Sequence, residues 1–359
     1  MVRQLTIVGP LPPPVHGYSL ITEAFSEILS DVEATIIIDT SQHTRLIRVL
    51  RDLLKNAITQ RSSCGTYLAL NGGARQWLDV LFFIPARIFR KNIIIHHHSF
   101  AYLTSKSSAA LKIIAMLGGN VLHIALCDRM KSLLNERYQL ALENIIVISN
   151  AAFVQVGREN YNQTSGIDDY CGFGNKSNGP IIGYLSKVSR EKGVFDYLDL
   201  LAELRKNGIE LTGVIAGELD DKDRHEFNDR LKNDRKISYI GPIYGEKKEK
   251  FLRTINVLVF PTRYLNEAEP VAILEALSRG VPVISYMRGC ISSLVSTKAG
   301  YVFDVSITTI KEIATTLKTD NFFTNLEAYA VEARRTFEEL KESSKSSLNF
   351  AIRFLSDEN

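Results

Sequence analysis

Short apolar segments rich in β-branched residues alternate along the chain with longer segments whose apolar positions repeat at helical spacing. Several of the short segments are apolar at nearly every position, which is typical of buried parallel strands. In the first half we predict strands at residues 4–8, 34–38, 66–70, 80–84, 92–96, 121–126 and 145–149. In the second half we predict them at residues 181–185, 211–216, 237–240, 257–260, 281–285 and 301–303.

Helices are predicted between these strands, for example at residues 193–207, 247–254 and 271–279, and a last one at 325–354. Alternation of this kind favours parallel sheets covered by helices on both faces. Residues 157–179 are rich in Asn, Gly, Ser and Asp and have no apolar period, so we expect a linker there. The pattern predicts two α/β halves, each with its own core.

Composition narrows the class of protein. A chain of 359 residues is long enough for two domains at roughly 150 residues each. With 45% hydrophobic and 23% charged residues it is neither disordered nor collagen-like. The net charge of +3 is too small to indicate nucleic acid as a partner. Its surplus lies in residues 1–175, which carry 16 basic and 13 acidic side chains.

The chain begins without a signal-peptide pattern, and its apolar runs fall short of the roughly 20 residues that span a bilayer. We therefore expect a cytoplasmic protein. The four cysteines are far apart and form no CxxC pair, which argues against a zinc ribbon.

The strongest candidate for chemistry is the segment 260–277, FPTRYLNEAEPVAILEAL. A predicted strand ends at Phe260, and a helix is expected to begin near Pro270 and to end at Gly280. Ligands of open α/β sheets bind beyond the carboxyl ends of strands, and a helix start favours phosphate. Glu267 and Glu275 would lie several ångströms apart, which suits two hydroxyl-bearing ends of one ligand. Two solvated acids beside an ordinary helix are an equal alternative.

A second candidate is the basic loop SKVSREKG at residues 186–193, which follows a predicted strand and opens a helix. Lys187, Arg190 and Lys192 there suit a diphosphate. A solvated charged loop is equally compatible with the pattern. The loop is not a P-loop, because GxxxxGK[ST] is absent.

A third candidate is the proline-rich loop after the first strand, GPLPPPVHGYS at residues 9–19. Its prolines stiffen the chain, and Gly17 allows a close approach to ligand phosphate or sugar. The loop lacks the GxGxxG fingerprint, which disfavours a nicotinamide or flavin cofactor.

Three histidines, His96 to His98, lie at a predicted strand end. No acidic or Cys ligand pattern accompanies them, so a hydrogen-bonding role at the ligand edge of the sheet is favoured over a zinc site. A structural histidine is the alternative for each of the three, and it is the preferred interpretation of His123.

Residues 44–58 form a basic amphipathic helix in the sequence pattern. Its expected apolar positions are Leu46, Val49, Leu50, Leu53 and Leu54, and its expected basic surface is Arg45, Arg48, Arg51 and Lys55. Such a helix suits an anionic membrane surface, and an ordinary surface helix is the alternative.

Together these features resemble the GT-B glycosyltransferases of family 4, which are retaining and use nucleotide-sugar donors. Glu267 and Glu275 match the E-x7-E motif of that family, and the run from Ser186 to Gly193 resembles its GRL-x-x-x-KG segment. Gly241 to Ile243 resembles the loop that contacts the base. Gly17 falls where the family has a glycine pair, and His98 falls near its active-site histidine.

The resemblance implies two Rossmann-like domains facing each other across a cleft. Residues 1–160 would bind the acceptor, residues 176–339 would bind the donor, and a helix at about 340–359 would pack back on the first domain. The implied catalytic residues are Glu267, His98, Lys187 and Lys192. The implied donor-binding residues are Glu275, Gly17, Arg190, Gly241, Ile243, Ala268, Glu269, Pro270 and Val271.

In these roles, Glu275 would bind the ribose hydroxyls and Glu267 the transferred sugar. The lysines would neutralise the leaving diphosphate, so that no metal and no cofactor is required. Three departures from the family pattern stand out: Lys187 replaces an arginine, His16 replaces the first glycine of the pair, and Glu269 stands where an apolar residue is common.

The resemblance thus implies a hexosyltransferase-type enzyme that moves a sugar from a nucleotide diphosphate donor, UDP-sugar before GDP-sugar, onto a glycan or lipid-linked acceptor. Bacterial surface polysaccharide or lipopolysaccharide assembly is the expected setting, on the inner face of the cytoplasmic membrane. The alternatives are a nucleotide-sugar epimerase of the same fold and an inactive scaffold or binding subunit.

Overall fold

The protein, described by a computed structural model, comprises two compact units. The structure describes residues 4–41, 46–104, 107–155 and 179–356, so the predicted linker at 157–179 lies almost wholly outside the described residues. The first unit contains residues up to Phe153, the stretch Asn266–Glu269 and the chain from Leu340 onward. The second contains Val154–Leu265 and Pro270–Glu339.

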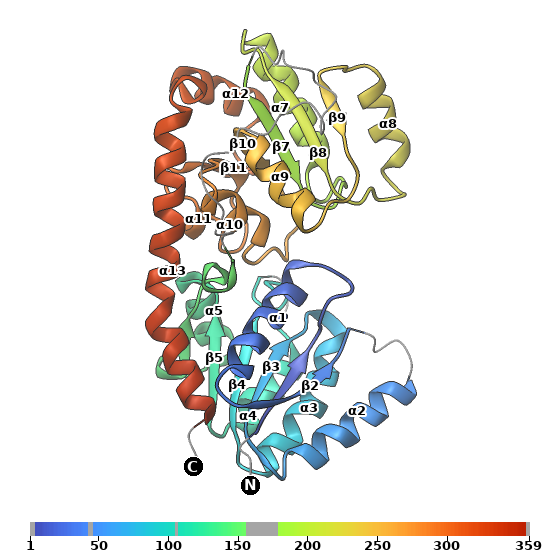
Figure 1. Ribbon diagram of the computed structural model, residues 1–359, viewed down its shortest axis with the longest axis vertical. Helices are drawn as coiled ribbons and strands as arrows, with labels where there is room; N and C mark the ends of the chain where they lie inside the picture. Colours follow the sequence, from blue (N-terminus) through green and yellow to red (C-terminus); the bar gives the residue numbers. More distant parts are fainter. Residues whose placement is uncertain (1–3, 42–45, 105–106, 156–178, 357–359) are drawn as a thin grey trace. The chain divides into compact units, whose positions relative to one another are not determined.

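The first unit is built on a parallel sheet in the order β2-β1-β3-β4-β5-β6 (Figure 1). Its elements are β1 (Gln4–Gly9), α1 (Gly17–Ser30), β2 (Ala34–Asp39), α2 (Leu46–Thr59), β3 (Ser63–Leu70), α3 (Gln76–Ile88), β4 (Asn92–His97), α4 (Ala109–Leu117), β5 (Val121–Ala125), α5 (Asp128–Tyr138) and β6 (Ile145–Val147). Helices α2, α3 and α4 pack in sequence as one layer on the sheet. Right-handed crossovers place α1 on the opposite face.

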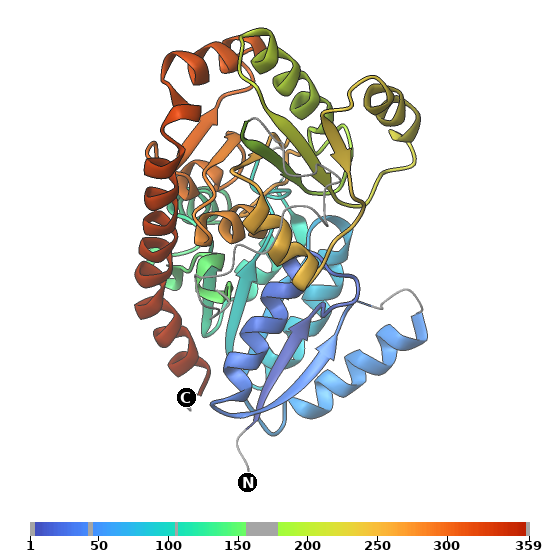
Figure 2. The same ribbon diagram turned by 45° about the horizontal axis from the view of Figure 1, so that its top comes forward.

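The second unit repeats this architecture with the strand order β12-β11-β10-β7-β8-β9. Figure 2 shows the same elements from a second direction. They are β7 (Ile181–Leu185), α7 (Val194–Lys206), β8 (Thr212–Ala216), α8 (Arg224–Lys232), β9 (Ile237–Tyr239), α9 (Glu246–Thr254), β10 (Val257–Phe260), α10 (Val271–Ser278), β11 (Val283–Tyr286), α11 (Ile291–Leu294), β12 (Gly300–Phe303), α12 (Ile310–Thr319) and α13 (Leu326–Ser356).

The central strands of both sheets are buried on both faces, as their apolar composition predicts. The predicted parallel α/β fold is therefore confirmed. The long helix α13 contributes residues to both units, and its last turns bond to the first: Asn92 Nδ2 donates to the carbonyl of Phe354 over 2.7 Å.

One predicted strand is wrong. Residues 80–84 lie inside α3, where Val80, Phe82 and Phe83 are buried and Leu81 and Ile84 are exposed. A short apolar run fits a buried strand and a helix equally well by composition. Here the residues on either side continue the helical period, which the five-residue run does not reveal.

Among the described helices, none combines the length and apolarity that crossing a membrane requires.

Candidate active site

The second sheet reverses its strand order between β7 and β10, which are hydrogen-bonded neighbours. From β7 the chain proceeds to β8 on one side, whereas β10 continues to β11 on the other. Open α/β sheets bind their ligands beyond the carboxyl ends of the strands at such a reversal point. Both candidate segments, residues 186–193 and 261–270, lie at this point of the sheet.

These two loops are tied to each other. The amide of Arg263 donates to the carbonyl of Glu191 over 3.0 Å, and the Arg263 guanidinium pairs with Asp196 at 2.5 Å. Gly193 has φ +82°, and a Cβ there would lie 1.9 Å from the carbonyl oxygen of Pro261. A side chain at position 193 is therefore excluded both by backbone conformation and by the neighbouring loop.

The two lysines of the basic loop hold distinct positions. Lys187 Nζ lies 2.7 Å from Asp220, and this hydrogen bond raises the pKa of Lys187. Lys192 Nζ lies 4.3 Å from the centre of the Tyr264 ring, a cation–π contact with the facing loop. Tyr264 thus holds the Lys192 ammonium between the two loops.

Arg190 contacts the neighbouring helices α7 and α8. Its guanidinium pairs with Glu226 of α8 and lies 4.5 Å from the centre of the Phe195 ring, and its amide donates to Asp223. The Arg190 side chain is therefore held by contacts with α7 and α8. A donor-binding role for this residue stays a prediction.

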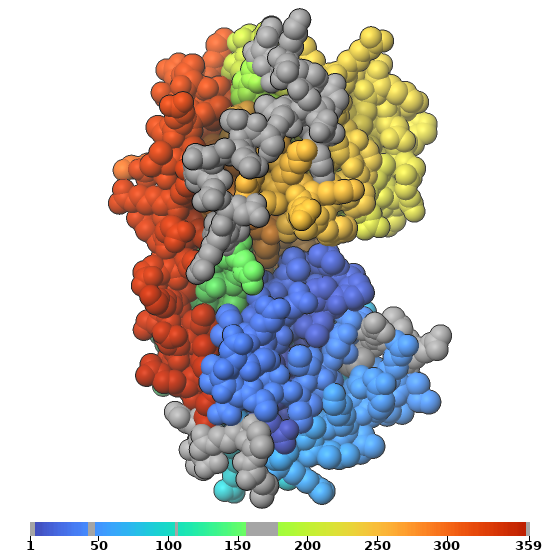
Figure 3. All heavy atoms as spheres, viewed as in Figure 1, coloured from blue at the N-terminus to red at the C-terminus, as the bar shows by residue number. Residues whose placement is uncertain are grey.

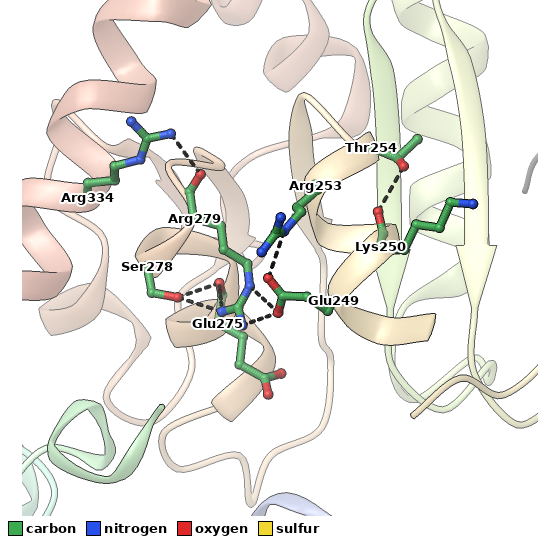
Figure 4. Close-up of polar contacts among 8 residues, drawn as sticks. All are labelled: Glu249, Lys250, Arg253, Thr254, Glu275, Ser278, Arg279 and Arg334. Carbon is green, nitrogen blue, oxygen red and sulfur yellow. Dashed lines mark hydrogen bonds and ion pairs between the residues drawn. The ribbon is translucent and has the colours of Figure 1, made fainter. Parts of the chain in front are cut away.

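Glu275 lies in the second turn of α10, and its carboxylate pairs with Lys248 of α9 at 2.5 Å. Figure 4 shows the carboxylate pointing away from a neighbouring network in which Glu249 bonds Arg253 and Arg279. Arg279 also donates to the carbonyl of Glu275 over 3.0 Å. This network fixes the α10 backbone, while the Glu275 side chain is left on a separate side of the helix.

The loop before α10 is divided between the two units. Pro270 is the N-cap residue of α10, the helix begins at Val271, and Gly280 follows it with φ +74°, as predicted. The preceding stretch Asn266–Glu269, which includes Glu267 and Ala268, clusters with the first unit, where the amide of Phe100 donates to the carbonyl of Asn266 over 3.3 Å.

Glu269 is the anchor of this stretch. Its buried carboxylate accepts hydrogen bonds from the Ser149 hydroxyl, at 2.9 Å, and from the Asn150 amide. The Asn150 side chain donates back to the Glu269 carbonyl over 3.1 Å. Burial raises the pKa of Glu269 to about 8, and these hydrogen bonds only partly oppose the shift. The contacts hold the side chain against residues that follow β6.

The raised pKa of Glu269 predicts that the stability of the folded protein depends on pH. The folded protein binds this proton more tightly than the unfolded chain, so stability is lost as pH rises from about 4.5 toward about 8. In thermal unfolding we expect Glu269→Gln to match the wild type at pH 5 and to be more stable at pH 9, by a few kcal/mol. Parallel pH curves for the two proteins would contradict this explanation.

Gly241 and Ile243 follow β9, at the same edge of the second sheet. Gly241 has φ +74°, and its carbonyl accepts from the amide of Gly217, which follows β8, over 2.9 Å. Ile243 is buried. The backbone after β9 is thus fixed beside the loop after β8. The predicted contact with a base would use backbone groups of this segment, so it does not depend on the buried Ile243 side chain.

In the first unit, Gly17 is the first residue of α1, and His16 caps the helix: the Ser19 amide donates to His16 Nδ1 over 3.0 Å. Next to it, the Tyr18 ring lies 4.6 Å from that of His98, centre to centre. His98 Nε2 is buried and has no hydrogen-bond partner within the described chain. An unpaired buried imidazole nitrogen is costly and suits a ligand contact.

Burial lowers the pKa of His98 to about 3, so its imidazole is neutral at ordinary pH. Its neighbours are structural. His96 bonds the Tyr67 hydroxyl at 2.9 Å, and His97 bonds His123 at 3.0 Å. His96, His97 and His123 are buried, and no group of three or more His, Cys, Asp or Glu side chains suited to a metal ion occurs among the described residues.

Four residues at these sites could not be assigned from spacing. Tyr18, Lys248, Asp220 and Tyr264 each contact a candidate residue from another segment. Tyr18 and Tyr264 do lie within motifs that the sequence singles out, but the motifs give these two residues no role. Lys248 and Asp220 carry no local signal, since their partners are 27 and 33 positions away.

Comparison with known proteins agrees with this geometry. A family model described as glycosyl transferases group 1 matches residues 172–336, which contain both the basic loop and the loop before α10. Solved structures resemble the whole chain. The chain has the GT-B fold. The Anabaena protein HepE in complex with UDP and glucose matches with a TM-score of 0.68 at 15% identity, covering 97% of this chain and 99% of HepE.

WaaG, a glycosyltransferase involved in lipopolysaccharide biosynthesis, matches with a TM-score of 0.64 at 12% identity, covering 96% of this chain and 99% of WaaG. Sucrose-phosphate synthase from Thermosynechococcus elongatus matches with a TM-score of 0.68 at 13% identity, covering 98% and 99%. None of the curated proteins matches the sequence. The predicted GT-B α/β fold class is thus confirmed, whereas identities this low carry no information on substrates.

Proposed function

We propose that this protein is a retaining, metal-independent glycosyltransferase of the E-x7-E type. It transfers a sugar from a UDP-sugar to a glycan or lipid-linked acceptor in bacterial surface polysaccharide or lipopolysaccharide synthesis. The observation that carries the proposal is the pair of interlocked loops at the reversal point of the second sheet, where Lys192 lies over the Tyr264 ring and Lys187 pairs with Asp220. This combination suits a sugar diphosphate.

In the proposed reaction the bond between the anomeric carbon and the diphosphate oxygen breaks, and negative charge develops on the departing UDP. Lys192 and Lys187 stabilise that charge, and the amides of Ala268 to Val271 approach the phosphate and sugar. The acceptor hydroxyl attacks from the face that the leaving group vacates, and its proton passes to a phosphate oxygen. The configuration at the anomeric carbon is therefore retained.

The carboxylates select the donor. Glu275 binds the ribose hydroxyls, exchanging its ion pair with Lys248 for hydrogen bonds to the ligand. Glu267 binds hydroxyls of the transferred sugar, and the backbone at Gly241 and Ile243 meets the base. Glu269 contributes by anchoring its loop, since its side chain is already bonded to Ser149 and Asn150.

We propose that the first unit binds the acceptor and that its His98 contacts the transferred sugar. Because burial lowers its pKa to about 3, it acts as a neutral hydrogen-bonding group through the unpaired Nε2. HepE has been solved with UDP-glucose, and that donor is the first choice for a test here.

A donor screen tests the proposal. The full chain is incubated with UDP- and GDP-sugars and a bacterial lipid extract as the source of acceptor, and release of the nucleoside diphosphate is measured. We expect UDP release from one UDP-sugar, stimulated by the extract. Absence of release from every donor would contradict transfer, and interconversion of the donor sugar without release would favour the epimerase.

A further inference from the structure

Helix α2 buries two polar side chains and exposes several large apolar ones. Its most buried residues are Val49, Asp52 and Asn56, and the Asn56 amide donates to the Phe82 carbonyl over 2.8 Å. Two of the leucines at its expected apolar positions face outward: Leu50 and Leu54 are 56% and 63% exposed. Exposed large apolar residues on this helix are Ile47, Leu50, Leu54 and Ile58.

The next two helices of the same layer continue this apolar surface. Trp77, Leu81, Ile84 and Ile88 recur at helical spacing on the exposed side of α3. Met116 on α4 is 86% exposed. Because α3 packs against both α2 and α4, these side chains belong to one layer, which we call the α2–α4 face. Its members are Ile47, Leu50, Leu54, Ile58, Trp77, Leu81, Ile84, Ile88, Phe89, Met116 and Leu117.

This concentration is specific to the α2–α4 face. It holds eleven of the twenty large apolar side chains that are exposed on the described chain. Figure 3 shows that other elements leave the side of α2 turned to the viewer uncovered. Exposed apolar patches of this extent mark a contact surface rather than ordinary scatter.

Exposed charge on the α2–α4 face is positive. The acidic residues within α2, α3 and α4 are Asp52 and Asp79, and both are buried. The cations include Lys55, Arg90 and Lys112, all exposed. Apolar side chains, a tryptophan and cations without exposed acids together suit the interface of an anionic bilayer.

A cavity lies beside α2, where Arg51 pairs with Asp52 at 2.9 Å and Lys55 donates to the carbonyl of Ile37 over 2.8 Å. It has a volume of about 380 Å³ and lies between α2 and the end of β2, where Arg48, Arg51 and Lys55 face Asp39 and Asp52. Three cations against two carboxylates leave a net positive lining, which favours an anionic headgroup.

We propose that the α2–α4 face docks the protein on an anionic phospholipid bilayer, with its apolar side chains in the interface and its cations on lipid phosphates. A second copy of this chain is a poorer occupant, because a two-fold interface would bring the like-charged helices together. Docking itself does not depend on the proposed function. Only the idea that the membrane presents a lipid-linked acceptor to the first unit rests on it.

Flotation with vesicles tests the docking surface without any substrate. The full chain is mixed with phosphatidylcholine vesicles with or without phosphatidylglycerol. We expect recovery with anionic vesicles only, reduced by high salt. Trp77→Ser combined with Ile88→Ser should weaken the partition coefficient by at least about tenfold, because two large apolar groups are lost from the interface. Ile307→Ser, at an 80% exposed position in the second unit, is the matched control.

A double variant, Lys55→Gln with Lys112→Gln, tests the contribution of positive charge separately from that of the apolar side chains. Lys232→Gln is its control. This pair should lower binding to anionic vesicles while leaving the fold, followed by circular dichroism, unchanged. Equal binding by wild type and the Trp77 and Ile88 variant would overturn the proposal. So would a dimer in light scattering that the same substitutions dissolve. Failure of sugar transfer with vesicle binding intact would count against the proposed function alone.

Discussion

Lys192→Ala should lower the rate of sugar transfer by about 10²–10³-fold, the largest effect we expect from a single substitution. The ammonium of Lys192 is held by the Tyr264 ring at the reversal point of the second sheet. In the proposed reaction the diphosphate gains additional negative charge in the transition state, so kcat is expected to fall more than the donor KM rises. Steady-state kinetics with the donor identified by screening measure both quantities.

Lys232→Ala is the matched control for this substitution, because Lys232 is an exposed lysine of the same unit that pairs with Asp229 on α8. Its activity should equal that of the wild type. Lys192→Arg should retain part of the rate, since the positive charge is kept while the ammonium geometry is lost. A Lys192→Ala enzyme with a kcat close to that of the wild type would remove Lys192 from the mechanism.

Glu275→Gln should raise the donor KM by about ten- to a hundredfold, because a carboxylate that accepts two ribose hydroxyls is replaced by an amide that accepts only on one side. The side chain also pairs with Lys248, so a structural role must be separated from a binding role. Lys248→Gln breaks the same ion pair but keeps the carboxylate.

The two variants therefore distinguish donor binding by Glu275 from a purely structural ion pair. If Glu275 binds the donor, Glu275→Gln raises KM and Lys248→Gln does so far less. If the ion pair serves only to join α9 to α10, both variants lose stability together and have similar kinetics. Melting temperatures recorded beside the kinetic constants show which pattern holds, and equal KM values for the two variants would contradict donor binding by Glu275.

Local sequence patterns predicted much of the fold. Buried strands such as β7 and β10 were identifiable from apolar composition, and the limits of α10 from Pro270 and Gly280. The pattern also located the basic loop and the loop before α10 at strand ends. Signals of this kind depend on neighbours within a few positions, which is why they can be taken from one sequence.

Contacts between distant segments could not be predicted in this way. The burial of Glu269 follows from Ser149 and Asn150, which lie about 120 positions earlier in the chain. Helix α2 shows the same limit: its amphipathic pattern does not indicate that Asn56 is buried, where its side chain donates to the carbonyl of Phe82 on α3. In both cases a polar partner from another element determines which side of the segment is buried.

The central claim is that the second unit binds a nucleotide diphosphate-sugar. Calorimetric titration of UDP into the full chain tests this claim most directly. The account predicts saturable binding at one site, weakened by about tenfold or more in Glu275→Gln and unchanged in Lys232→Ala. Absence of UDP binding to the wild type, or equal affinity in the wild type and Glu275→Gln, would contradict it.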